Sequence, residues 1–106
     1  MTPSVWIVNK GNHPYHHAER FGQLRVLTEG RVNVFSIDNL TADICNKLKA
    51  AAQPEDYLLI SGYAIPNGIA ISWYLKRFGI VRMLVWGATR QEYTTVTLTN
   101  DLLSVE

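Results

Sequence analysis

Cysteine is almost absent from this sequence, because Cys45 is the only one in 106 residues. A single cysteine cannot form an intrachain disulfide or the cysteine-rich ligand set of a structural zinc site. It is compatible with a reducing compartment, and we expect a cytoplasmic protein. Since Cys45 falls in an apolar helical pattern, we expect a small buried side chain rather than a reactive thiol.

Long hydrophobic runs and a strong net charge are also missing. The longest apolar candidates are interrupted by Lys76, Arg77 and Arg82, and the N-terminal segment lacks the basic start of a signal peptide. We therefore expect a soluble protein without a membrane partner. Ten Lys and Arg against nine Asp and Glu leave a net charge of +1, which gives no reason to expect binding to nucleic acid.

The composition is that of an ordinary globular protein, with 47% hydrophobic and 18% charged residues. The length fits one domain with one hydrophobic core, and no internal repeat or linker divides the chain. We predict a single α/β domain over residues 1–106.

Short apolar runs, typical of buried strands, alternate with helical patterns along the chain. The predicted strands are Val5–Val8, Leu24–Leu27, Val32–Phe35, Tyr57–Ile60, Ile80–Trp86 and Gln91–Leu98. The predicted helices are a short one over His13–Gly22, one from Asp38 or Asn39 to Ala52, and one over Pro66–Phe78.

Two strand–helix–strand units over residues 32–86 predict a small Rossmann-like, doubly wound and mostly parallel sheet. Gln91–Leu98 alternates polar and apolar residues after a turn at Ala88–Arg90, which predicts an antiparallel edge strand. Leu24–Leu27 and Val32–Phe35 are spaced for a hairpin turned at Gly30, although an irregular connection also fits.

Ligands of such sheets bind beyond the carboxyl ends of the strands, where the loops diverge. Four segments follow predicted strands: Asn9–His13, Ser36–Asp38, Ser61–Tyr63 and Trp86–Gly87. The ligand-binding residues predicted from these segments are Asn9, Lys10, His13, Asp38, Ser61, Gly62, Tyr63 and Trp86.

Ser61–Gly68 is a glycine turn that leads into a helix, as phosphate-binding loops do. It lacks both the Lys-Ser/Thr pair of a Walker loop and the Gly-x-Gly-x-x-Gly dinucleotide pattern. The segment fits either an anion cradle or a plain connecting turn, and no cofactor can be assigned from it.

All three histidines lie close together, at His13, His16 and His17. The His-Glu-x-x-His pattern is absent and no third ligand is fixed, so no metal site is predicted. Tyr63 and Trp86 are candidates for stacking on a planar ligand, and His13 is the one candidate acid or base.

These features favour a binding domain for a small anionic, nucleotide-like ligand held at the strand-end crevice. One alternative is an enzyme that processes phosphate esters or nucleotides with His13 and Lys10, although no complete catalytic constellation is visible. Another is a homodimer or a module that docks on a larger protein through Pro66–Phe78 and Gln91–Leu98. Leu102–Val105 could instead cover that edge strand.

Overall fold

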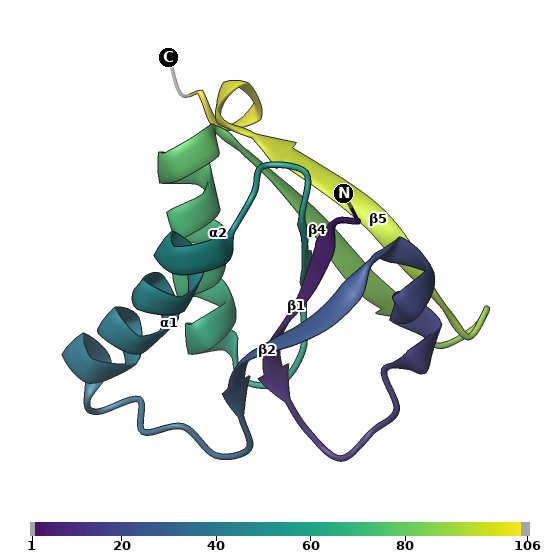
Figure 1. Ribbon diagram of the computed structural model, residues 1–106, viewed down its shortest axis with the longest axis horizontal. Helices are drawn as coiled ribbons and strands as arrows, with labels where there is room; N and C mark the ends of the chain where they lie inside the picture. The colour runs from purple at the N-terminus through teal and green to yellow at the C-terminus, as the bar shows by residue number, and fades with distance from the viewer. Residues whose placement is uncertain (1, 105–106) are drawn as a thin grey trace.

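The structure is a computed structural model that describes residues 2–104. Within these residues the chain forms a five-stranded sheet in the order β2-β1-β3-β4-β5, with two α-helices and two short 3₁₀ helices (Figure 1). The elements are β1 Ser4–Lys10, η1 His16–Phe21, β2 Gln23–Glu29, α1 Ile37–Ala51, β3 Tyr57–Leu59, α2 Ala64–Phe78, β4 Ile80–Gly87, β5 Glu92–Thr99 and η2 Asn100–Leu103.

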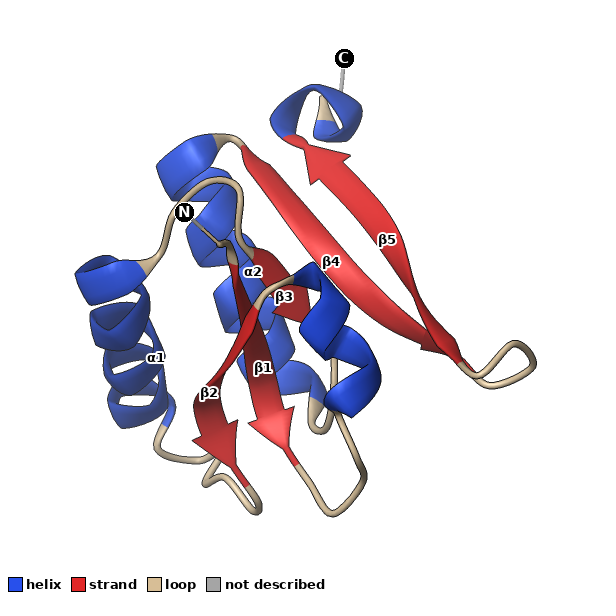
Figure 2. Cartoon of the chain, turned by 45° about the vertical axis from the view of Figure 1, so that its right-hand side comes forward, coloured by secondary structure: helices blue, strands red, loops and turns tan. Residues whose placement is uncertain are grey.

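The sheet is mostly parallel, because β1 pairs in parallel with β2 and β3, and β3 pairs in parallel with β4. Only β5 runs antiparallel to its neighbour β4. The helices α1 and α2 cover one face of the sheet, and η1 lies on the other (Figure 2). Among residues 2–104, no helix is long and apolar enough to cross a membrane.

Strand β1 lies in the middle of both hydrophobic clusters. Trp6 and Val8 pack under the α-helices, while Val5 and Ile7 point to the face covered by η1. Alternate residues of a strand point to opposite faces, so a strand covered on both sides needs a continuous apolar run. The run Val5–Val8 predicted such a strand, and the structure confirms it.

The two α-helices begin and end close to the predicted residues. Leu40, Ile44 and Leu48 of α1 are buried, as their four-residue spacing predicted. Helix α2 ends at Gly79, which takes the left-handed conformation with φ 75° that favours glycine after a helix. It begins at Ala64, two residues before the predicted Pro66.

The short helix after β1 is a 3₁₀ helix rather than an α-helix. Tyr15 and Ala18 are buried against the sheet and Phe21 packs beside them. Their three-residue spacing matches the three residues per turn of a 3₁₀ helix, so all three side chains reach the same face.

The predicted strand over Val32–Phe35 was wrong. No strand forms there, and β2 pairs in parallel with β1 instead of forming a hairpin with this segment. Asn33 explains the irregular path, because its side chain accepts a hydrogen bond from the Phe35 N–H and donates one to Ser36. Ser36–Asp38 therefore follows a loop rather than a strand.

The antiparallel edge strand is confirmed as β5, which pairs with β4 along its whole length. The chain turns between them at residues 88–91, one residue longer than the turn predicted at Ala88–Arg90. Leu102 and Leu103 are 70% and 50% exposed rather than packed on this edge, and Val105 lies outside the described residues.

A buried carboxylate ties the amino ends of the sheet together. Asp56 is 2% exposed and accepts hydrogen bonds from Ser4 N, Trp6 Nε1 and Gln53 N at 2.9–3.1 Å. The Tyr74 hydroxyl donates to Gln53 O at 3.3 Å and lies beside the same carboxylate. These bonds fix the positions of β1, the start of β3 and the end of α2 relative to one another.

We expect Asp56→Asn to destabilise the protein by about 2–4 kcal/mol, because an amide NH₂ would face N–H donors and leave them unpaired in the core. Urea unfolding at pH 7 measures this loss. The neighbouring Glu55 is exposed, so Glu55→Gln is the matched control and should change stability by less than about 0.5 kcal/mol. Equal effects of the two substitutions would contradict the assigned role.

Burial, and after it the Asp56 carboxylate, raise the pKa of the Tyr74 hydroxyl far above its usual range. The unfolded chain therefore loses this proton at a lower pH than the folded protein does. The stability that the protonated hydroxyl contributes is fully present below about pH 10 and should fall by about 1.4 kcal/mol per pH unit above it. Tyr74→Phe should lose about 1 kcal/mol at pH 7 and show a shallower alkaline decline. Unfolding midpoints at pH 8 and pH 10.5 test this, and identical slopes would contradict it.

Candidate functional site

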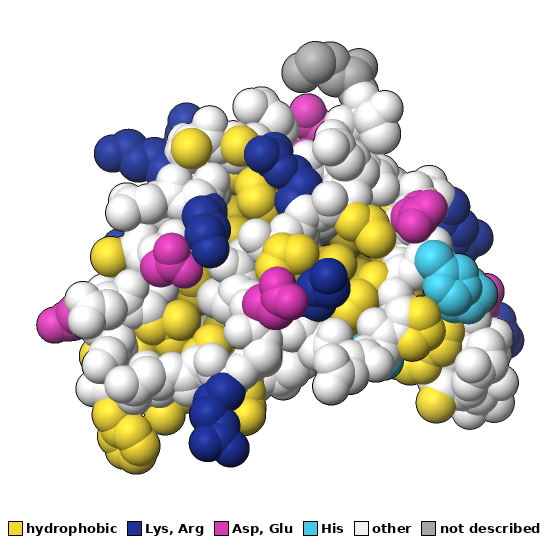
Figure 3. All heavy atoms as spheres, turned by 60° about the horizontal axis from the view of Figure 1, so that its bottom comes forward, with side chains coloured by type: hydrophobic (Ala, Val, Ile, Leu, Met, Phe, Trp, Pro, Cys, Tyr) yellow, Lys and Arg dark blue, Asp and Glu magenta, His cyan; other side chains and the backbone are white. Residues whose placement is uncertain are grey.

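The carboxyl ends of β1, β2 and β3 lie at one edge of the sheet because these strands are parallel. The chain leaves β1 toward η1 on one face and leaves β3 toward α2 on the other. Neighbouring loops that depart to opposite faces leave a crevice between them. Figure 3 turns this edge forward and shows hydrophobic patches with separate basic and acidic side chains between them.

The crevice has a volume of about 330 Å³ and brings together residues from three loops. Its lining includes Lys10, His13, Tyr15, Arg31, Gly62 and Tyr63. Lysine, arginine and histidine can all carry positive charge, and no carboxylate is among the lining residues. Glu29 is aligned with Lys10 in the strand register but lies outside this lining.

Asn9, near the end of β1, holds the loops after β2 and β3 together. Its side chain is 3% exposed and donates to Thr28 Oγ1 at 3.0 Å and to Gly30 O at 2.9 Å. Its Oδ1 accepts the Tyr63 N–H at 3.0 Å. Both amide hydrogens are therefore used within the protein, and we assign Asn9 a positioning role rather than ligand contact.

Ser61 has a similar supporting role and is not among the residues that line the crevice. Its hydroxyl donates to Asn9 O at 3.0 Å, which joins β1 to the loop after β3. The Asn67 side chain fixes the same loop, because its Nδ2 donates to Ser61 O at 2.7 Å and Tyr63 O at 2.6 Å. Asn67 is buried, so the loop enters α2 on a rigid support.

Gly62 lies where the loop passes over Asn9. Its φ of 72° falls in the left-handed region, and a Cβ there would overlap the Asn9 side chain. No side chain caps the first turn of α2. The N-terminal end of this helix carries a partial positive charge, which adds to that of the lining cations.

Besides Ser61, two further predicted site residues lie outside the crevice lining. Asp38 is exposed in the first turn of α1 and is not part of the crevice lining. Trp86 packs on the η1 face, where His17 stacks on it with ring centroids 5.7 Å apart. Asp38 was assigned to this edge because a strand was incorrectly predicted at Val32–Phe35. Trp86 points to the face of the sheet opposite the one covered by α2.

The three histidines do not form one cluster. The His13 ring packs on Tyr15 at 4.2 Å between centroids, whereas His16 and His17 pair with each other on η1. Within residues 2–104 no group of three or more His, Cys, Asp or Glu could hold a metal ion. His13 is exposed at the mouth of the crevice and its Nδ1 lies 3.2 Å from Pro14 O.

The sequence pattern did not point to Arg31 or Asn67. Arg31 was assigned to a hairpin turn, and only the parallel pairing of β2 with β1 brings it beside Lys10. Asn67 appeared as an ordinary residue of a helical first turn. Its position one turn after Tyr63 was the only available signal, because asparagine near a helix start can bond to nearby backbone.

Comparison with protein families matches residues 3–100 to the family described as Phage Pam3 gp32-like protein. The chain belongs to this family. No curated protein and no solved structure matches the chain. The matched range includes every strand and both α-helices among the described residues, and the residues that line the crevice.

We expect Gly62→Ala to destabilise the protein by about 2–3 kcal/mol, because the new Cβ combines a left-handed backbone with a clash against Asn9. Gly68→Ala is the matched control. Gly68 lies inside α2 with open space where a Cβ would lie, so alanine there should stabilise by up to about 1 kcal/mol. Thermal unfolding of both variants measures the difference in sign, and two effects of the same sign would contradict the prediction.

Proposed function

We propose that the crevice binds a small anionic ligand, of the phosphate or nucleotide class, and that the protein acts by binding. The observation that carries this proposal is the gathering of Lys10, His13 and Arg31 from two loops around a crevice without a carboxylate in its lining. Cationic side chains and open N–H groups at a helix start are the usual partners of phosphate oxygens.

The order of the strands supports the same place for the ligand. The order β2-β1-β3-β4 reverses direction at β1, and the crevice lies beyond the carboxyl ends of β1 and β3. In doubly wound, Rossmann-like sheets this is the position where nucleotides bind. We propose that the present sheet is used in the same way, with Tyr63 beside the crevice as a stacking surface for a planar base.

Binding without turnover fits the residues better than catalysis. In the enzyme alternative His13 would act as acid or base beside Lys10, and a catalytic histidine is normally oriented by a further polar group. Here the neighbours of His13 are the Tyr15 ring and the Pro14 carbonyl. We therefore expect a ligand recovered after long incubation, with and without divalent metal, to be unchanged.

Calorimetric titration with inorganic phosphate and with ATP tests the binding. We expect Lys10→Ala and Arg31→Ala each to weaken the affinity about 3- to 10-fold through loss of a charged partner. Glu29→Gln should strengthen it severalfold because it removes the acidic group aligned with Lys10.

Lys49→Ala is the control, because Lys49 lies in the last turn of α1 at the opposite edge of the sheet. It should leave the affinity unchanged. Absence of binding at millimolar phosphate or ATP would contradict the proposal, as would equal losses in Lys10→Ala and Lys49→Ala. Hydrolysis of ATP that depends on His13 would replace it with the enzyme alternative.

A further inference from the structure

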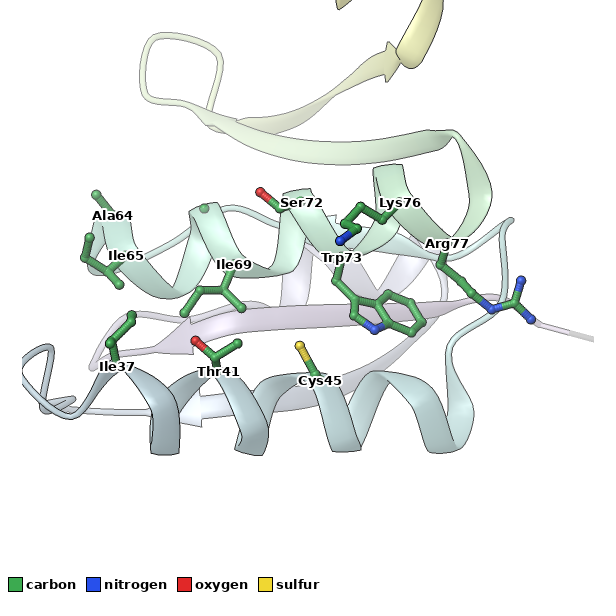
Figure 4. Close-up of a pocket in the computed structure, with 11 residues that line it drawn as sticks. Ile37, Thr41, Cys45, Ala64, Ile65, Ile69, Ser72, Trp73, Lys76 and Arg77 are labelled. Atoms are coloured by element: carbon green, nitrogen blue, oxygen red, sulfur yellow. The ribbon is translucent and has the colours of Figure 1, made fainter.

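A second surface lies on the opposite side of the α-helices from the sheet. A groove of about 840 Å³ runs between α1 and α2, and its residues come from both helices (Figure 4). Ile37, Ile65, Ile69 and Trp73 give it an apolar floor, with Thr41 and Cys45 beside them. Cys45 is thus half-buried in a groove rather than fully buried as predicted from the sequence.

The groove continues into an apolar patch at one end. Ile37 and Ile65 are each 45% exposed there. Phe35, two residues before α1, is 96% exposed but lines a separate hollow with residues 31–34. Large exposed apolar side chains that adjoin an apolar groove are typical of a surface that another protein covers. The anion-binding crevice is lined by other residues, so this surface is independent of the proposed function.

The charges on this surface are separated along its length. Helices α1 and α2 each connect two parallel strands and therefore run in the same direction. Ile37 and Ile65 lie at one end of the groove and Arg77 at the other (Figure 4). Asp38 and Lys49 flank the groove on α1, because Asp38 in the first turn lies three residues before Thr41 and Lys49 in the last turn lies four residues after Cys45. Lys76 and Arg77 line the groove in the last turn of α2.

We propose that this face binds a second copy of the chain, with the helices of the two copies antiparallel about a two-fold axis. In that arrangement Asp38 of each copy meets Lys49 of the other, and each helix start meets a helix end of opposite partial charge. The two apolar floors then form the core of a four-helix interface. A parallel arrangement would instead place Lys49 against the basic end of α2 in the other copy.

The size of the face sets the expected strength. Each helix has 15 residues and is therefore about 22 Å long, and two adjacent helices span about 20 Å. The area of such a face is toward the small end of the range for specific interfaces. We therefore expect a dimer with a dissociation constant in the micromolar range.

Sedimentation equilibrium of the full chain, from about 1 µM to about 1 mM, should show a monomer–dimer equilibrium. Gly68→Glu should weaken it at least tenfold, because Gly68 lines the groove with open space around it and two carboxylates would become buried at the interface. Thr95→Glu places the same charge on the exposed edge strand β5 and should leave the dimer intact.

A monomer throughout this range would overturn the proposal. So would any result in which Gly68→Glu weakens the dimer no more than Thr95→Glu, since the contact would then lie on the strand edge or elsewhere. Because these variants keep Lys10 and Arg31, the outcome is separate from that of the phosphate titrations.

A charge exchange tests the antiparallel arrangement even if Gly68→Glu fails to fold. Asp38→Lys should weaken the dimer about fivefold, because the contact occurs twice and becomes repulsive. Adding Lys49→Asp should restore the dimer. Failure of this restoration would overturn the antiparallel pairing.

Cys45 provides a further check, because it is the only cysteine and lies near the middle of α1, close to the proposed two-fold axis. A short bismaleimide should join two copies of the wild-type chain but not of Gly68→Glu. A dimer in sedimentation that the reagent does not join would place the contact away from this face and overturn the proposal.

Discussion

Burial of strand β1 on both faces is the constraint on which the other elements depend. Trp6 and Val8 require the cover of α1 and α2, and Val5 and Ile7 require η1 on the other side. A strand in this position must also pair along both of its edges, which β2 and β3 do in parallel. The layered arrangement thus follows from the need to bury one continuous apolar run.

Polar side chains bond to β1 at its two ends. Asp56 accepts the Ser4 N–H at the amino end, and Asn9 joins the loops after β2 and β3 at the carboxyl end. A buried polar group needs its partners to avoid a large desolvation cost, so these residues specify how the loops close over the sheet. The shape of the crevice therefore depends on Asn9 even though its amide is not free to contact a ligand.

The two proposed surfaces use different physical chemistry. The crevice concentrates positive charge from Lys10 and Arg31 beside backbone at a helix start, which suits a small anion. The helical face is apolar in its groove and charged at its ends, which suits a protein surface of matching length. Because both lie within the range matched by the Pam3 gp32-like family, they can be compared in any other member.

The sequence by itself determined the elements whose side-chain patterns are local. The run Val5–Val8, the spacing of Leu40, Ile44 and Leu48, and Gly79 after α2 each identified an element correctly. Tertiary structure decided which strands pair and which polar groups find partners. Val32–Phe35 has the composition of a strand, but Gln23–Glu29 takes the place beside β1, and only this pairing brings Arg31 to Lys10. Propensity acts over a few neighbouring residues, whereas pairing and hydrogen-bond satisfaction depend on segments that are distant in the chain.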